Sequence, residues 1–356
     1  MLRIISQFGQ VIPSCRLDNV IIVSDADTVD VTIAADGSTI LRSRYFLTDN
    51  AVTITNLREL IELYIRENTD GNTVSVFISA STSNEEADTD LKVMYCDRDI
   101  GNVDFAAWLN QNFLSVAPFH RIATSDVVSL SWYSEDADSG PVSIQFKYFN
   151  SDGILDCDEY FDSFSGEVGD VINYDFYVKD WIDSMLSPGQ TLASVTLRVG
   201  DRSTTMFVDQ SLQSARRFAF RNCFNIVETL PILCTTTTKA IADRSIASVG
   251  RTSMFYDVKN TIAYETETAP LSVDECILIE QLCLSHKVKI LWDDTTETDF
   301  DALPEILITD FTCEISDTIH SLNRVKFTWQ FADHCPKIAL PSTPGIFYDT
   351  YNQVFS

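Results

Sequence analysis

Histidine and cysteine are the side chains of this 356-residue chain that could most readily do chemistry. The four histidines stand singly, at positions 120, 286, 320 and 334, and the nine cysteines form no CxxC pair, so neither type has the ligand spacing of a zinc site. The odd number of cysteines and their apolar surroundings indicate reduced, buried thiols. No GxSxG elbow and no GxGxxG or GxxxxGK loop is present. The sequence therefore predicts a non-enzymatic protein without catalytic residues, metal ions or cofactors.

Carboxylates outnumber every other ionisable group. The chain has 52 Asp and Glu residues against 25 Lys and Arg residues, a net charge of −27. A glycosidase needs only two carboxylates at the correct separation, but in so acidic a chain no pair stands out. The turn at residues 150–159 offers several oxygen ligands, yet their order departs from that of an EF-hand, and a solvated turn is favoured over a calcium site.

The charge excludes some partners and favours others. An acidic excess of this size repels phosphate backbones, so we expect no sequence-specific nucleic-acid binding, although an anionic wall would let DNA pass without sticking. Because 45% of the residues are hydrophobic, we expect a folded chain and not a disordered one. Neither a signal peptide nor a run of about 18 apolar residues is found, so a soluble protein made in a reducing cytoplasm, without membrane insertion, is expected.

Local patterns divide the chain into three predicted domains and an arm. Residues 1–84 are expected to form a β-rich domain with one helix, 85–210 an antiparallel β domain, 211–340 an α+β domain, and 341–356 an extended docking arm. The polar segment 81–89 is the predicted linker between the first two domains. The predicted fold class is mainly β with a few helices, built from antiparallel β-sandwich or barrel domains.

Alternation of apolar and polar residues predicts most strands of the first two domains. Residues 29–33 and 39–41 flank the turn Asp36-Gly37, which predicts a hairpin, and residues 56–65 show helical spacing behind Asn56 as a cap. In the second domain, a short helix is predicted from Phe105, Trp108, Leu109 and Phe113. Strands are predicted there at 127–132, 142–148, 171–178, 192–199 and 204–208.

The third domain combines one helix with a small sheet. Ser272 and Glu275 form a capping box that predicts a helix over 273–284. Strands are predicted to follow at 287–292, 305–309 and 324–331. Arg221 is the predicted structural anchor, because its guanidinium has to be paired or stacked among neighbouring aromatic rings. These neighbours are Phe218, Phe220 and Phe224.

The last 16 residues follow neither a helical nor a strand period. Two prolines and a glycine in residues 341–356 favour an extended backbone. The aromatic side chains of this arm are expected to dock on a neighbouring surface, either of the same fold or of another subunit. They are Phe347, Tyr348, Tyr351 and Phe355.

Three stretches of the third domain together resemble a known group of proteins. They are residues 218–229 (FAFRNCFNIVET), residues 264–271 (YETETAPL), and residues 303–310 (LPEILITD) followed by 322–329 (LNRVKFTW). Their order and spacing resemble virion or tail-associated proteins encoded by phages and prophages of gut Bacteroidota. The stretch from Asp36 to Tyr64 in the first domain, which opens with DGSTIL, and Phe113-Leu114 in the second are similar to the same group.

The resemblance implies a structural role in the virion, in a tail, baseplate or tail-hub ring, with copies of the same chain and other tail proteins as partners. It carries over no site residues. The chain lacks the glycine-rich repeats of an elongated fibre, which favours a hub, ring or adaptor over a receptor-binding shaft.

Two other function classes remain as alternatives. One is a β-sandwich adhesin that binds bacterial surface glycan through exposed Trp and Asp side chains, for which an exposed Trp181 or Trp292 on a concave face would be the sign. The other is a polysaccharide-degrading enzyme, for which the sequence names no carboxylate pair. The first expectation is a protein that acts by assembly.

Overall fold

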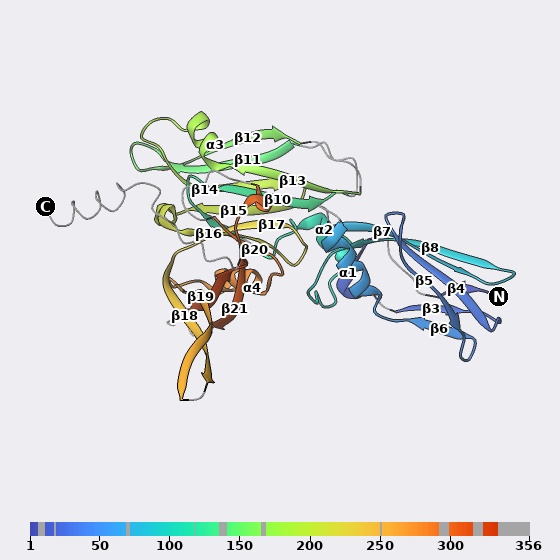
Figure 1. The fold of residues 1–356 in the computed structure, drawn as a ribbon. Helices are drawn as coiled ribbons and strands as arrows, with labels where there is room; N and C mark the ends of the chain where they lie inside the picture. Colours follow the sequence, from blue (N-terminus) through green and yellow to red (C-terminus); the bar gives the residue numbers. More distant parts are fainter. Residues whose placement is uncertain are drawn as a thin grey trace.

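The chain is described by a computed structural model over residues 1–5, 11–17, 19–68, 72–117, 119–134, 141–164, 169–249, 251–291, 299–315 and 323–333 (Figure 1). These residues form mainly antiparallel sheets with four α-helices, which confirms the predicted mainly β class. None of the described helices is long and apolar enough to cross a membrane.

Two sheets and one helix enclose the core of the N-terminal region. The elements are β1 (Arg3–Ile4), β2 (Val11–Pro13), η1 (Ser14–Arg16), β3 (Val20–Val23), β4 (Thr28–Ala35), β5 (Ser38–Phe46), β6 (Ala51–Ile54), α1 (Leu57–Asn68), β7 (Thr73–Ser81) and β8 (Glu86–Met94). The sheets have the orders β2-β8-β7-β4-β5 and β1-β3-β6. Leu57, Ile61 and Ile65 recur at helical spacing in α1 and are buried among strand side chains, so this face of the helix closes the core.

The predicted hairpin at the start of this region is confirmed, but the predicted linker is wrong. β4 and β5 are joined by Asp36 and Gly37, which both have positive φ angles, as a two-residue hairpin turn requires. Segment 81–89 is not a linker, because β7 and β8 pair with each other across it from Ser81 to Glu86. Its polarity arises because the first five residues of β8 lie at the solvent-facing end of the hairpin. The first sheet therefore extends beyond the expected boundary at residue 84.

The middle region contains a five-stranded sheet and a strand pair. Its elements are α2 (Phe105–Gln111), β9 (Phe119–Ile122), β10 (Val127–Tyr133), β11 (Pro141–Phe149), β12 (Leu155–Ser163), β13 (Val171–Tyr177), α3 (Val178–Met185), β14 (Thr191–Val199), β15 (Arg202–Val208) and η2 (Gln210–Ser214). The sheet order is β12-β11-β14-β15-β9, and β10 pairs with β13. Trp132, Phe146 and Phe176 are fully buried in one core cluster, so the two layers pack through aromatic rings.

The C-terminal region is one seven-stranded sheet with a helix packed on it. Its elements are β16 (Arg216–Arg221), β17 (Val227–Ile232), β18 (Cys234–Val249), β19 (Thr252–Thr268), α4 (Val273–Leu284), β20 (Val288–Leu291), η3 (Phe300–Ala302), β21 (Glu305–Glu314) and β22 (Arg324–Phe331). The strand order is β17-β16-β20-β21-β22-β19-β18. The capping box is confirmed, since the Ser272 hydroxyl accepts from the Glu275 amide at 3.2 Å and the Glu275 carboxylate accepts from the Ser272 amide at 2.8 Å.

The three regions share one apolar cluster where they meet. It contains residues of all three regions: Met94, Cys96, Phe105, Leu109, Leu114, Tyr133, Cys223 and Phe224. The expected boundary at residue 210 falls between β15 and β16, which belong to different sheets. The rings of Trp108 and Phe224 stack at 5.2 Å, so the middle and C-terminal regions are held by aromatic contact.

Trp329 anchors the C-terminal sheet, and its removal should be costly. The side chain is fully buried, stacks on Tyr264 at 4.2 Å, and donates from Nε1 to the Thr266 hydroxyl at 3.0 Å. We expect Trp329→Ala to lower the free energy of unfolding by about 3–5 kcal/mol, because it leaves a large cavity. Urea denaturation checks this, with Trp329→Phe as the control that keeps a ring and loses only part of the stability. An equal loss in both variants would contradict the cavity explanation.

Candidate assembly surface

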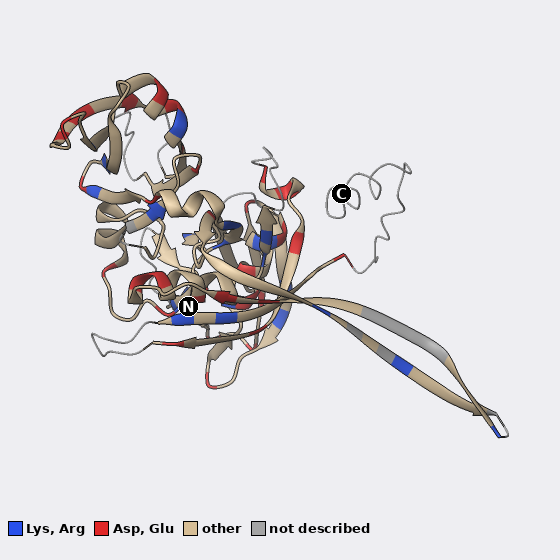
Figure 2. Ribbon diagram, turned by 90° about the vertical axis from the view of Figure 1, so that its left-hand side faces the viewer, with Lys and Arg blue, Asp and Glu red and all other residues tan. Residues whose placement is uncertain are grey.

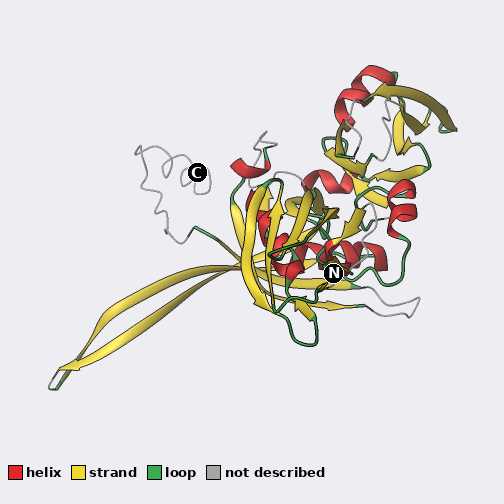
Figure 3. Ribbon diagram, turned by 90° about the vertical axis from the view of Figure 1, so that its right-hand side faces the viewer, coloured by secondary structure: helices red, strands yellow, loops and turns green. Residues whose placement is uncertain are grey.

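A long two-stranded hairpin projects from the C-terminal sheet. β19 pairs with β22 only between Tyr264 and Glu267, whereas it pairs with β18 along nearly its whole length. Residues 239–263, here called the arm, therefore extend beyond the sheet, and Figures 1 and 3 show the hairpin reaching away from the body. Twelve residues of β19, 252–263, correspond to about 40 Å at the rise of a β-strand.

The backbone of the arm is open to another strand. In the described part of the chain, β18 is the last strand of the seven-stranded sheet, and β19 has no second partner over residues 252–263. A two-stranded ribbon on its own is marginally stable, and unpaired strand edges are templates for pairing with another chain. The arm therefore has the form of a β-augmentation element.

The side chains of the arm differ from those of the rest of the chain. Four large apolar side chains are 41–61% exposed: Ile246, Met254, Phe255 and Ile262. Residues 239–263 also contain four basic and two acidic residues, in a protein whose net charge is −27. Figure 2 shows basic positions along the hairpin in contrast to the acidic positions on the body. The arm is thus an apolar and locally basic projection on an acidic protein.

The root of the arm is rigid. The hydroxyls of Thr236 and Thr266 are hydrogen-bonded to each other at 3.1 Å. The Thr266 hydroxyl also accepts from the Trp329 indole at 3.0 Å. Tyr264 stacks on the same indole, and Phe331 packs edge-on against both rings. Because these contacts fix both strands where they leave the sheet, the direction of the arm is set by the core.

A second unpaired edge lies on β12 in the middle region. β12 pairs with β11 along its whole length and is the outer strand of its sheet in the described residues. It is strongly acidic and carries no basic residue, its carboxylates being Asp156, Asp158, Glu159 and Asp162. Phe161 is 64% exposed, and the Cys157 thiol is exposed and free. Sequence analysis missed this strand, because exposure on both faces removes the alternation that identifies a half-buried strand.

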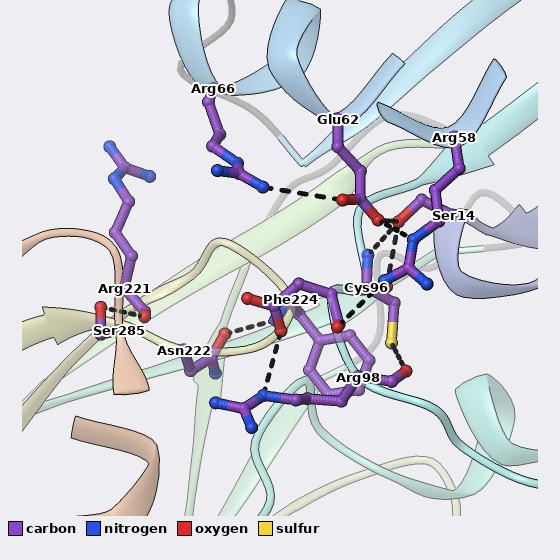
Figure 4. Close-up of polar contacts among 11 residues, drawn as sticks. Ser14, Arg58, Glu62, Arg66, Cys96, Arg98, Arg221, Asn222, Phe224 and Ser285 are labelled. Carbon is purple, nitrogen blue, oxygen red and sulfur yellow. Dashed lines mark hydrogen bonds and ion pairs between the residues drawn. The ribbon is translucent and has the colours of Figure 1, made fainter. Parts of the chain in front are cut away.

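A buried carboxylate holds the N-terminal region together at its junction with the rest of the protein. Glu62 of α1 accepts from Ser14 Oγ and from Arg58 Nε, both at 2.8 Å, and lies 3.6 Å from Arg66 (Figure 4). The Ser14 hydroxyl in turn accepts from the amide of Cys96 at 2.8 Å. Sequence analysis missed this network because its members are distant in sequence and unremarkable in type.

The same network continues into the C-terminal region. The Asp97 amide donates to the Cys223 carbonyl at 3.1 Å, and Arg58 donates to the Asp97 carbonyl at 3.0 Å. The Tyr95 ring lies 6.2 Å from that of His286. Burial, together with the positive charges of Arg66, Arg221 and Lys287, lowers the pKa of His286 to about 4. The junction therefore contains a neutral histidine at physiological pH.

Two cysteines meet beside this junction. Cys15 is hydrogen-bonded to the Cys96 thiol, and this bond, with the nearby guanidinium groups of Arg58 and Arg16, lowers the pKa of Cys15 to about 7. The hydrogen bond with Cys15, and next burial, raise the pKa of Cys96. All eight cysteines in the described residues are free thiols. Cys15 is half-buried, so it is the junction thiol most open to alkylation.

The Arg221 guanidinium stacks on an aromatic ring, but the ring is that of Phe300 and not one of the phenylalanines near Arg221 in the sequence. Its guanidinium lies 5.4 Å from the centre of the Phe300 ring and donates from Nη1 to the Asn225 carbonyl at 2.8 Å. Its own carbonyl accepts from the Ser285 hydroxyl at 2.7 Å (Figure 4). Phe218 and Phe220 point instead into the fully buried core. Arg221 thus ties β16 to η3 and to the end of α4.

The structure describes some of the other residues singled out from the sequence and leaves others outside the described residues. Phe347, Tyr348, Tyr351 and Phe355 lie outside the described residues, as does Trp292. Trp181 of α3 packs against Phe146 and Phe176, with ring centres 6.0 Å away in both cases, and so presents no open aromatic platform. In the suspected calcium turn, Asn150 Oδ1 accepts from the amides of Asp152 and Ile154, which is an ordinary side-chain turn.

An ion triad joins the middle region to α4. Arg121 bonds both Asp209 and Glu275, the latter at 2.8 Å. The hydrogen bond from Arg121 and those from Ser272 hold the pKa of Glu275 below its usual range in spite of its burial. A cavity of about 80 Å³ lies beside the triad, lined by Leu230, Pro231 and other apolar residues. Small-molecule sites begin at about 300 Å³, so this cavity does not fit an organic substrate.

His120 of β9 is held neutral next to this triad. Its Nε2 is buried without a hydrogen-bond partner in the described part of the protein, and burial lowers the pKa of the ring to about 4. A cavity of about 20 Å³ lies beside the ring, lined also by Asp126 and Pro231. The ring is therefore a buried structural histidine and not a general base near neutral pH.

Comparison with known proteins adds no identity. No protein-family model matches the chain, and no curated protein matches it. Among solved structures it is similar to a chimeric titin Z1Z2 functionalized with a KLER exogenous peptide from decorin (11% identity, TM-score 0.18), which covers 58% of this chain and 96% of that chain. It is also similar to a chimeric titin Z1Z2-Z1Z2 tandem functionalized with a GRGDS exogenous peptide from fibronectin (10% identity, TM-score 0.18), covering 59% of this chain and 100% of that chain. At this TM-score neither likeness supports an argument about fold or function.

The buried network around Glu62 predicts a localised loss of stability. Glu62→Gln removes the charge that accepts from Ser14 and Arg58, so we expect a loss of about 2 kcal/mol in the free energy of unfolding. Urea denaturation measures this loss. Glu59→Gln, an exposed change on the same helix, is the matched control and should stay within about 0.5 kcal/mol of wild type. Equal effects of the two changes would contradict a structural role for the network.

His120 predicts a dependence of stability on pH. Since its folded pKa of about 4 lies below the ordinary value of 6.5, the unfolded chain binds more protons between these values, and stability falls as the pH drops from 6.5 to 4. Relative to His120→Leu, wild type should lose on the order of 1 kcal/mol per pH unit in that window. Urea midpoints at pH 4.5 and 7 of both proteins provide the test. Parallel pH profiles would show that the ring is not buried in its neutral form.

Proposed function

We propose that this chain is a non-enzymatic structural component of a phage virion, in a tail, baseplate or tail-hub ring, which works by assembly with copies of itself and with other tail proteins. The observation that carries the proposal is the arm. A projecting hairpin with open edges and exposed apolar side chains has no use within its own fold, but it is suited to bind a neighbouring subunit.

Three further features support this proposal. The resemblance of residues 218–229, 264–271, 303–310 and 322–329 to tail-associated proteins of Bacteroidota phages implies the particle and the location. The net charge of −27 suits a wall past which DNA slides, because polyanions do not adhere to it. Glu62 and Arg221 are structural, because each bonds or stacks on residues of another element.

The arm can be removed without disturbing its root. Lys239 and Ala263 are register partners, so replacing residues 240–262 by Asn-Gly closes a short hairpin at that pair. We expect the wild-type chain to form assemblies whose size grows with concentration in sedimentation velocity, and the shortened chain to stay monomeric with an unchanged midpoint of thermal unfolding. A wild-type protein that stays a single particle at every concentration would refute the proposal, as would a shortened protein that assembles equally well.

A separate experiment tests the proposed location in a virion. Particles released from an induced host that encodes this chain should contain it, at a stoichiometry of several copies per particle by quantitative mass spectrometry. Its absence from purified particles would remove the virion from the proposal while leaving assembly to the sedimentation experiment.

A further inference from the structure

The proposed assembly requires a receiving surface for the arm, and the described edges of the sheets differ in their fitness for that role. β5 is an outer strand with Arg42 and Arg44, so it would repel a basic arm. β2 is only three residues long, and β17 contains Pro231, which cannot donate to a new strand. β12 is nine residues long, open on its outer edge, and acidic.

We propose that the arm of one copy adds to the outer edge of β12 on the next copy of this chain, in a head-to-tail contact. This inference rests on the proposed assembly function and identifies the two surfaces that form the interface. Backbone hydrogen bonds would extend the five-stranded sheet, while the exposed Phe161 and Leu155 of β12 would meet the apolar side chains of the arm.

Charge favours this pairing over a pairing with β5. Arg244 and Arg251 of the arm have no ion pair in the described residues, and neither do Asp156, Asp158, Glu159 and Asp162 of β12. In the described residues the β12 carboxylates bond only neutral donors. Asp158 accepts from the Tyr148 hydroxyl at 2.7 Å and Glu159 from the Ser143 hydroxyl at 2.5 Å, while Asp162 accepts from the Tyr174 hydroxyl and the Ser163 amide, both at 2.8 Å. Two unneutralised surfaces of opposite sign thus exist on a single chain.

The arrangement of the fold makes the contact intermolecular. Figure 1 shows β12 at the top of the molecule and the arm reaching out from its lower side, so the arm of a chain points away from its own β12. Figure 2, turned by 90°, likewise shows the arm leaving the body on one side. A contact between two different surfaces of identical copies is heterologous, and it produces a closed ring or a filament and not a symmetric dimer.

Charge exchange between the two surfaces tests the inference. Arg244→Glu/Arg251→Glu gives a chain with an acidic arm and an acidic β12, and Asp156→Lys/Asp158→Lys/Glu159→Lys gives a chain with a basic arm and a basic β12. We expect each variant alone to assemble at least tenfold more weakly than wild type in sedimentation velocity at low salt. An equimolar mixture should regain assembly, because each arm then meets an edge of opposite sign.

The control keeps the change in net charge and moves it elsewhere. Arg3→Glu/Arg198→Glu lowers the net charge by the same amount on exposed residues of β1 and of the inner strand β14, and it should assemble like wild type. A failure of the mixture to assemble would overturn the pairing of the arm with β12, and so would equal weakening by the control. If the wild type itself never assembles, the proposed function fails, which is a different result from a failed exchange.

A crosslink locates the contact directly. Cys157 is a natural exposed thiol on β12, so Ala242→Cys in the arm places a second thiol on the proposed partner surface. A short bismaleimide should join two chains in this variant, and the linked product should disappear when Cys157→Ser is added. A product that persists without Cys157 would show that the arm docks elsewhere, since half-buried thiols such as Cys15 would then supply the link.

Discussion

The contact between Tyr264 and Trp329 sets the direction of the hairpin that gives this molecule its distinctive form. One ring belongs to a strand of the arm and the other to the core of the C-terminal sheet, and they stack at 4.2 Å with nearly parallel planes. A free β-ribbon would twist and bend without such a constraint. Because the indole is also hydrogen-bonded to Thr266, both the position and the orientation of the root are fixed.

A hairpin that projects from a highly acidic protein has a physical consequence. Copies of a chain with a net charge of −27 repel one another, and this repulsion is smallest where the sign of the surface is locally reversed. In the arm, four basic residues outnumber two acidic ones along a projecting hairpin. The acidic surfaces of two copies repel each other, whereas the basic arm is attracted to an acidic surface. This combination favours one way of docking over the others, and so gives the contact specificity.

The body that carries the arm is joined by polar networks as well as by apolar packing. Glu62, Asn222 and Glu228 are buried polar groups with hydrogen-bond partners, and Glu62 and Asn222 each link segments that are distant in sequence. Burial raises the pKa of Glu228, whose carboxylate accepts from Asn222 at 2.5 Å. Such satisfied groups fix the relative position of packed regions more narrowly than apolar contact alone, because hydrogen bonds are directional.

Local patterns alone were enough to define the hairpin at Asp36-Gly37, the helix capped by Ser272 and most half-buried strands, because turn chemistry, capping and alternation depend on near neighbours. They misplaced the boundary near residue 84, and they missed β12 and the 33-residue pair β18 and β19, because strands exposed on both faces have no core to impose a period. Only the tertiary structure decided that Arg221 stacks on Phe300, that Glu62 joins Ser14, and that one hairpin leaves the sheet, since each depends on residues brought together from distant parts of the chain.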